Sequence, residues 1–202
     1  MQRREHRSRA LLGAALLALL LGGLLPAAAG AATTPFHRDL RAIEAKLRDA
    51  IEFEPVEMTE HLTAAEDVCE VGEGAQGRGD AAGAEADWST LAQLVAVLGE
   101  PSARRVDTAL ARADSALRRL GDKYAAYWPD AGRRRALRAG VKDARAGLAA
   151  VRRAVATIGG SFAAWRAHDC AAATSAIESG VSLVPGAIAP INRGMARLWA
   201  LP

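Results

Sequence analysis

The sequence predicts an all-α protein, a helical bundle of four to six helices that includes one long antiparallel helical hairpin. Apolar residues recur at spacings of three and four along most of the chain after residue 34, which is the period of an amphipathic helix. Stretches that alternate apolar and polar residues, as half-buried strands do, are hard to find. Because each apolar helix face must be covered by another, a bundle is the expected architecture.

The first 31 residues have the composition of a cleavable signal peptide. Four arginines precede an apolar run at residues 10–25, and small residues follow at 27–32. A positive start, a short apolar segment and a small-residue cleavage site define such signals. The run of about 16 residues is shorter than the roughly 20 that a spanning helix needs. Cleavage is expected after Ala29, Ala31 or Ala32, of which we favour Ala31. We then expect no stable membrane span and an extracytoplasmic protein, periplasmic or secreted, with a single all-helical domain over residues 32–202.

Removal of the signal changes the charge of the protein. The signal holds four of the 26 lysines and arginines and one of the 23 acidic residues, which leaves 22 of each. A neutral exported domain lacks the cationic surplus that nucleic-acid binding needs. The charge is uneven, since residues 32–100 carry 15 acidic and 5 basic residues and residues 101–202 carry 7 and 17. The two halves either interleave their charges around one bundle or form a two-faced binding surface.

Cys69 and Cys170 are the two cysteines of the sequence. An oxidising compartment makes a disulfide between them the expected state. Two buried thiols and a thiolate metal site are the alternatives, and no CxxC pair supports the second of these.

The N-terminal helices are predicted from caps and periodicity. Thr34 and Pro35 form an N-cap and a first helical residue. The proline at 55 predicts a break, after which a second helix follows over residues 56–70. The inner faces of these two helices are Phe36, Leu40, Ile43, Leu47 and Ile51, then Met58, Leu62, Ala65 and Cys69.

Residues 71–86 contain five glycines and no large apolar side chain. This composition predicts a flexible Gly-rich surface loop. A third helix is expected over residues 87–98, and residues 99–102 predict a turn with a new N-cap.

The C-terminal half predicts the long hairpin. Apolar residues step by four and three from Val106 to Tyr127, and the same rhythm continues from Leu137 to Trp165. The turn signal at residues 129–132 makes these two helices antiparallel neighbours. The glycines at 159 and 160 predict a kink or break. Asp169 is expected to cap a further helix to residue 180, and Pro185 to separate it from a last helix over residues 187–200.

Glu57, Met58 and His61 are the candidate metal-binding residues. Their spacing of three and four places them on one helix face, where a carboxylate, a thioether and an imidazole suit a transition metal or haem iron. The competing interpretation is that Met58 fills the core and His61 pairs with Glu57. No paired Glu-x-x-His motifs and no CxxCH haem attachment site occur.

The candidate partner-binding residues lie at the end of the fourth predicted helix. They are Tyr127, Trp128, Arg133, Arg134 and Arg135. Aromatic rings beside arginines suit an anionic ligand or a protein partner. The alternative is that a core end lies beside a solvated first turn.

The sequence carries no constellation that predicts catalysis. His168, Asp169 and Cys170 are adjacent, but catalytic groups meet in space from distant positions, and a disulfide would remove the thiol. Glycine-rich phosphate loops, GxSxG elbows and HExxH helices are missing. We therefore expect a non-enzymatic exported bundle, without a cofactor, that binds a protein partner or a cell-envelope component; a bundle that binds a metal or haem is the alternative.

Overall fold

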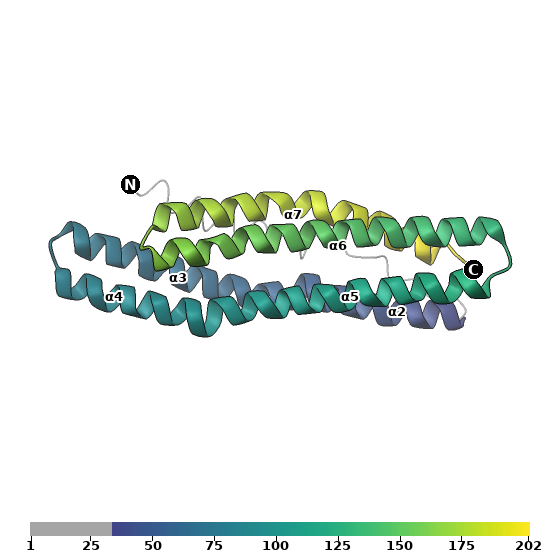
Figure 1. Cartoon of the computed structure of the whole chain (residues 1–202), viewed down its shortest axis with the longest axis horizontal. Helices are drawn as coiled ribbons and strands as arrows, with labels where there is room; N and C mark the ends of the chain where they lie inside the picture. The colour runs from purple at the N-terminus through teal and green to yellow at the C-terminus, as the bar shows by residue number, and fades with distance from the viewer. Residues whose placement is uncertain (1–33) are drawn as a thin grey trace.

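The computed structural model describes residues 34–202, so the predicted signal peptide and its cleavage site lie outside the described residues. The described part forms four long helical rods that run side by side and antiparallel (Figure 1). No strand occurs between residues 34 and 202. The predicted all-α bundle is confirmed.

Each of the first two rods is built from two α-helices joined by a π-helical turn. The first rod comprises α2 (Pro35–Arg48), η1 (Asp49–Phe53) and α3 (Glu54–Gly77). The second comprises α4 (Ala81–Leu94), η2 (Val95–Gly99) and α5 (Glu100–Tyr127). The third and fourth rods are single helices, α6 (Ala131–Arg166) and α7 (Cys170–Trp199).

The predicted break at Pro55 and the predicted turn at residues 99–102 are wrong, and the π-helical turns explain why. Each turn ends two residues before a proline, Pro55 or Pro101. Proline has no N–H for the helical ladder. Just before each proline, the wider π-helical turn shifts the backbone hydrogen bonds by one residue. The N–H of Glu54 donates to the carbonyl of Asp49, and the N–H of Glu100 donates to the carbonyl of Val95. Each rod therefore passes its proline without stopping.

The predicted loop at residues 71–86 is also wrong, because both of its flanks are helical. Helix α3 continues to Gly77 and α4 starts at Ala81. The turn between them uses Gly79, whose φ is +76°, and Asp80, whose side chain accepts from the N–H of Gly83 at 2.9 Å. The small residues of this segment allow close packing: Gly72, Ala75 and Ala84 are buried between the two helices.

The helix breaks expected at residues 159–160 and at Pro185 are absent. Helix α6 is continuous through both glycines, and α7 is continuous through Pro185 and Pro190. Both helices are held by an apolar face that stays buried on either side of these positions, from Leu137 to Trp165 on α6. Packing of a long amphipathic face outweighs a local loss of helix propensity.

The predicted hairpin is present, since α5 and α6 are joined by the short turn at residues 128–130. The closest pair of helices is a different one, α6 and α7. Small residues recur every seven positions on both, and all of them are buried: Gly140, Gly147, Ala154 and Ser161 on α6, and Ala173, Gly180, Ala187 and Gly194 on α7. We call these residues the small-residue seam.

The seam brings backbone against backbone. A Cβ atom placed on Gly147 would lie 2.7 Å from the carbonyl oxygen of Ala187, and one on Gly180 would lie 2.7 Å from that of Ala154. A Cβ on Gly194 would lie 2.6 Å from the carbonyl oxygen of Gly140. Glycine is therefore required at these positions by space.

A disulfide joins the first rod to the fourth. Cys69 of α3 and Cys170, the first residue of α7, are bonded, as predicted, with their Cα atoms 5.8 Å apart. Beside it, the ring of His168 stacks on Trp88 of α4 with centroids 4.5 Å apart. Asp169 caps α7 by accepting from the N–H of Ala172 at 2.9 Å, as expected. Covalent and stacked contacts thus gather three rods at this end.

The close packing at the seam predicts that adding one methyl group to a glycine of α7 changes the free energy of unfolding strongly, and that the change depends on the position of the glycine. Gly180→Ala should lower the free energy of unfolding by about 1–3 kcal/mol, because the added carbon meets the α6 backbone. Gly186→Ala, in the same helix, should raise it by about 0.5–1 kcal/mol, since nothing lies within 4 Å of that Cβ and alanine favours helix. Urea unfolding of both variants with the disulfide intact measures the difference. Equal effects would show that the seam does not limit the approach of α6 to α7.

Candidate functional site

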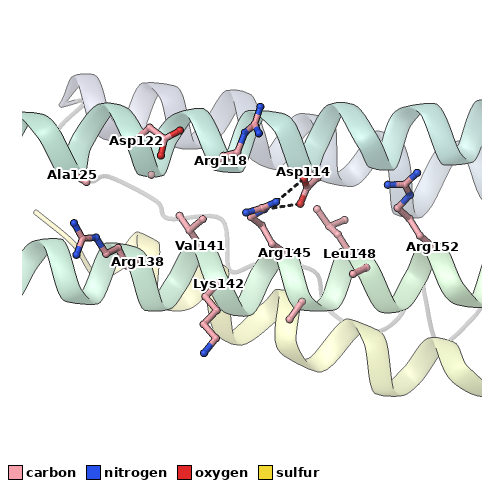
Figure 2. A pocket seen from close by; sticks show the side chains of 13 residues that line it. Asp114, Arg118, Asp122, Ala125, Arg138, Val141, Lys142, Arg145, Leu148 and Arg152 are labelled. Carbon is pink, nitrogen blue, oxygen red and sulfur yellow. Dashed lines mark hydrogen bonds and ion pairs between the residues drawn. The ribbon is translucent and has the colours of Figure 1, made fainter.

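A groove lies between α5 and α6. It has a volume of about 750 Å³ and is lined by residues 114–125, in the C-terminal half of α5, and by residues 138–152 of α6 (Figure 2). Its lining consists of charged and small or apolar side chains: Asp114, Arg118, Gly121, Asp122, Ala125, Arg138, Val141, Lys142, Arg145, Ala146, Leu148, Ala149 and Arg152.

Small residues create the hollow. Gly121 and Ala125 of α5 face Val141 of α6, and a Cβ on Gly121 would lie 3.5 Å from the Val141 side chain. On α6, Ala146 and Ala149 contribute little volume to the lining. The gap between the two helices is therefore floored by short apolar groups, and the long charged side chains form its walls.

Two arginine–aspartate bridges span the gap. Arg145 of α6 holds both carboxylate oxygens of Asp114, at 2.7 and 3.1 Å. Arg152 holds both oxygens of Asp107 in the same way, at 2.7 and 3.0 Å. The hydrogen bonds to these carboxylates raise the pKa of both arginines above its usual value, so both guanidinium groups stay charged. The bridges therefore link α5 to α6 across the groove.

Three cations of the groove remain unpaired. Among the described residues, Arg118, Arg138 and Lys142 have no ion-pair partner. In Figure 2 the Arg118 side chain projects from α5 away from α6, Arg138 lies on α6, and Lys142 projects from α6 away from α5. With Arg145 and Arg152 the lining holds five cationic side chains against two carboxylates, those of Asp114 and Asp122. The groove therefore carries a net positive charge and has cations available for a ligand.

The sequence analysis missed these residues, although a signal for them exists. Arg138, Arg145 and Arg152 recur every seven residues along α6, so they share one face of the helix. Opposite them, Asp107, Asp114 and Gly121 recur every seven residues along α5. A search for charged residues at this period would have found both walls.

The predicted partner-binding residues are divided by the structure. Tyr127 is 76% exposed, but Trp128 is only 7% exposed because its ring packs on Phe36, with centroids 4.9 Å apart. Arg134 donates to the carbonyls of Trp128 and Pro129, at 2.8 and 2.6 Å, and so closes the C-terminal end of α5. Trp128 and Arg134 thus have structural roles.

Arg133 and Arg135 are exposed at the start of α6. They lie within about one and a half helical turns of Arg138, where the groove begins. Arg135 is about 60° around the helix from Arg138 and adjoins that end of the groove, whereas Arg133 is seven residues before Gly140 and lies on the opposite face of α6.

The three candidate metal-binding residues each have a separate environment. Met58 is 3% exposed and belongs to the core. His61 shares a hydrogen bond of 3.0 Å between its Nδ1 and the Oγ of Ser102, and the carboxylate of Glu57 lies 2.7 Å from Arg105. The described residues contain no group of three or more His, Cys, Asp or Glu side chains placed to hold a metal ion.

Charge is partly interleaved and partly segregated. Lys123 pairs with Asp39, Arg105 with Glu57, and Arg166 with Glu100, so the two halves of the chain do exchange ion pairs. Residues 60–87, at the α3–α4 end, nevertheless hold eight acidic residues and one basic residue. Residues 118–145, which include the opposite turn of the bundle, hold nine basic and three acidic residues (Figure 1). The long axis of the bundle therefore runs from an acidic end to a basic end.

Searches against known proteins returned no match: no family model, no curated protein and no solved structure resembles this chain. In the part of the chain that the structure describes, no helix is both long and apolar enough to cross a membrane.

Glu66 is the buried carboxyl group of the bundle that carries a shifted pKa. Burial raises its pKa above the ordinary 4.5, opposed by a hydrogen bond of 3.0 Å from the Thr174 hydroxyl. The neighbouring charges of Glu70, Asp67 and Glu178 raise it further. A raised pKa means that the folded state holds the proton more tightly than the unfolded chain.

The stability that Glu66 contributes should therefore be complete below the ordinary carboxyl pKa and be lost as the pH rises through the raised value. Glu66→Gln removes the charge and keeps a partner for Thr174, so it should stabilise the protein at pH 7 and lose that advantage toward pH 4. Thermal unfolding across this range measures the effect, with Glu73→Gln as an exposed control on α3. A constant difference between Glu66→Gln and the parent protein at all pH values would contradict the prediction.

Proposed function

We propose that this chain is an exported, non-enzymatic helical-bundle protein that binds an anionic partner or cell-envelope component through the α5–α6 groove. The observation that carries the proposal is the set of three unpaired cations, Arg118, Arg138 and Lys142, among the residues that line a groove of about 750 Å³. Guanidinium groups bind oxyanions through paired hydrogen bonds, and the ammonium group adds a point charge.

The charge distribution of the whole molecule supports binding of an anion at the groove. The acidic α3–α4 end is repelled by an anionic surface, and the basic end that carries the groove is attracted to it. Two groove arginines are already held by Asp114 and Asp107, so a ligand meets guanidinium groups that are positioned before it arrives. Preorganisation of this kind lowers the entropic cost of binding.

The supports for export are the N-terminal sequence and the disulfide. The signal-like residues 1–31 direct the chain out of the cytoplasm, and Cys69–Cys170 suits an oxidising compartment. The mass of the protein purified from the exported fraction should match a chain that starts near residue 32 and has lost about 2 Da of hydrogen to the disulfide. A mass that includes the intact N-terminus would refute cleavage.

Binding through the groove predicts a specific loss in a triple variant. Arg118→Gln, Arg138→Gln and Lys142→Gln together should weaken sedimentation with envelopes isolated from the producing cells by about tenfold or more, at roughly 1 kcal/mol for each exposed contact. The matched control is Arg112→Gln, Arg119→Gln and Arg193→Gln, which removes the same charge from exposed positions outside the groove lining.

Binding of the parent protein should also fall as salt is raised. Equal losses in the two triple variants would reject the groove as the binding surface, and absence of binding by the parent protein would reject the proposed function.

A further inference from the structure

The cations of the α5–α6 groove form a line. Arg138, Lys142, Arg145 and Arg152 lie along α6 at spacings of four, three and seven residues. At a rise of 1.5 Å per residue, the line from Arg138 to Arg152 is about 21 Å long. Arg135 continues it toward the end of the bundle. A ligand that meets all these cations must be extended in the direction of the helix axis.

The groove offers charge and little else for recognition. Its lining contains aspartate, arginine, lysine, glycine, alanine, valine and leucine side chains, and no serine, threonine, asparagine, glutamine, histidine or aromatic residue. Such a lining has no neutral hydrogen-bonding side chains to read the hydroxyl groups of a sugar or the edges of a base. It is suited to a ligand that repeats the same anionic group many times.

Single contacts in this groove are weak. The cationic groups lie at the surface, where water and salt screen each ion pair. A compact anion meets one or two of them and gains little. A linear chain of anions meets several in succession, and each contact after the first is made at a high local concentration. Its binding also releases the counterions that surround such a chain.

From these observations we propose that the ligand of the groove is a linear polyanion with an oxyanion on each repeat, lying along α6 between the two helices. This inference rests on the proposed function and specifies the class of its ligand. A folded acidic protein is the alternative occupant, and it presents carboxylates on a broad surface, which meets a narrow groove at few points. The Asp114–Arg145 and Asp107–Arg152 bridges stay in place as the tie between the walls.

Chain length is the variable that tests the proposal. Binding to the full mature protein is measured by titration with inorganic phosphate, tripolyphosphate, and polyphosphate chains of about 15 and about 45 units. We expect no saturation by inorganic phosphate at millimolar concentration and a gain in affinity of about tenfold or more from tripolyphosphate to the 15-unit chain. From the 15-unit to the 45-unit chain, the affinity per phosphate should change little, because the added length extends beyond the line of cations.

Salt dependence and variants locate the contacts. With three unpaired cations engaged, a fourfold rise in salt should lower the affinity roughly twentyfold. The Arg118, Arg138 and Lys142 triple variant should lose most of this salt dependence, whereas the Arg112, Arg119 and Arg193 triple variant should keep it.

Asp122→Asn should change the affinity in the opposite direction. It removes a carboxylate from the groove lining and should raise affinity for the 15-unit chain about threefold, which a misfolded variant does not do. Poly-glutamate and a sulfated polysaccharide of similar charge number, tested in parallel, show which oxyanion the line prefers.

The outcomes separate the two proposals. Equal affinity per phosphate for tripolyphosphate and the longer chains, or tighter binding to a folded acidic protein of the same net charge, would overturn the polyanion inference. If the groove triple variant still lost its binding to isolated envelopes, the proposed function would stand without it. If polyphosphate binds with the expected length dependence but envelopes do not, the ligand class stands and its source lies outside the envelope.

Discussion

The small-residue seam between α6 and α7 determines how the other rods are placed. Because Gly147, Gly180 and Gly194 leave no room for a Cβ, the two helices meet backbone to backbone along most of their length. On its other side α6 meets α5 through longer side chains, and the Asp114–Arg145 and Asp107–Arg152 bridges cross the gap between them. Close packing on one face and a wider gap on the other produce the groove.

The ends of the bundle are fixed by different means from its middle. At the acidic end, Cys69–Cys170 ties α3 to α7, and His168 lies flat on Trp88. At the basic end, Arg134 closes α5 while Trp128 packs on Phe36. Chain-entropy arguments give a closed loop of about 100 residues up to roughly 4.7 kcal/mol of stabilisation. The seam needs such end contacts, since a uniform repeat of small residues alone leaves α7 free to slip by seven residues along α6.

The fold class, the hairpin and the disulfide could be predicted from the sequence. The first two follow from the helical spacing of apolar residues, and the third from the presence of two cysteines. The helix ends were harder. Pro55 and Pro101 remove one hydrogen bond each, a local cost that the π-helical turns absorb while the buried faces continue. Residues 71–86 look flexible by composition, yet their glycines and alanines serve close packing, and composition alone does not separate the two uses of a small residue. The arginines at 133–135 marked the right helix, but Arg134 is used internally and the groove lies further along.

One seven-residue period serves both packing and charge on α6. Gly140, Gly147 and Ala154 follow it on the face toward α7, and Arg138, Arg145 and Arg152 follow it two residues earlier. Two residues correspond to about 200° around a helix, so the arginine line lies on the opposite side from the seam. A change in the charged line therefore leaves the packing of α6 on α7 intact, and a change in the seam shifts the whole wall of the groove. The chemistry of the groove is free to vary in sequence while the seam, which holds the wall in position, is not.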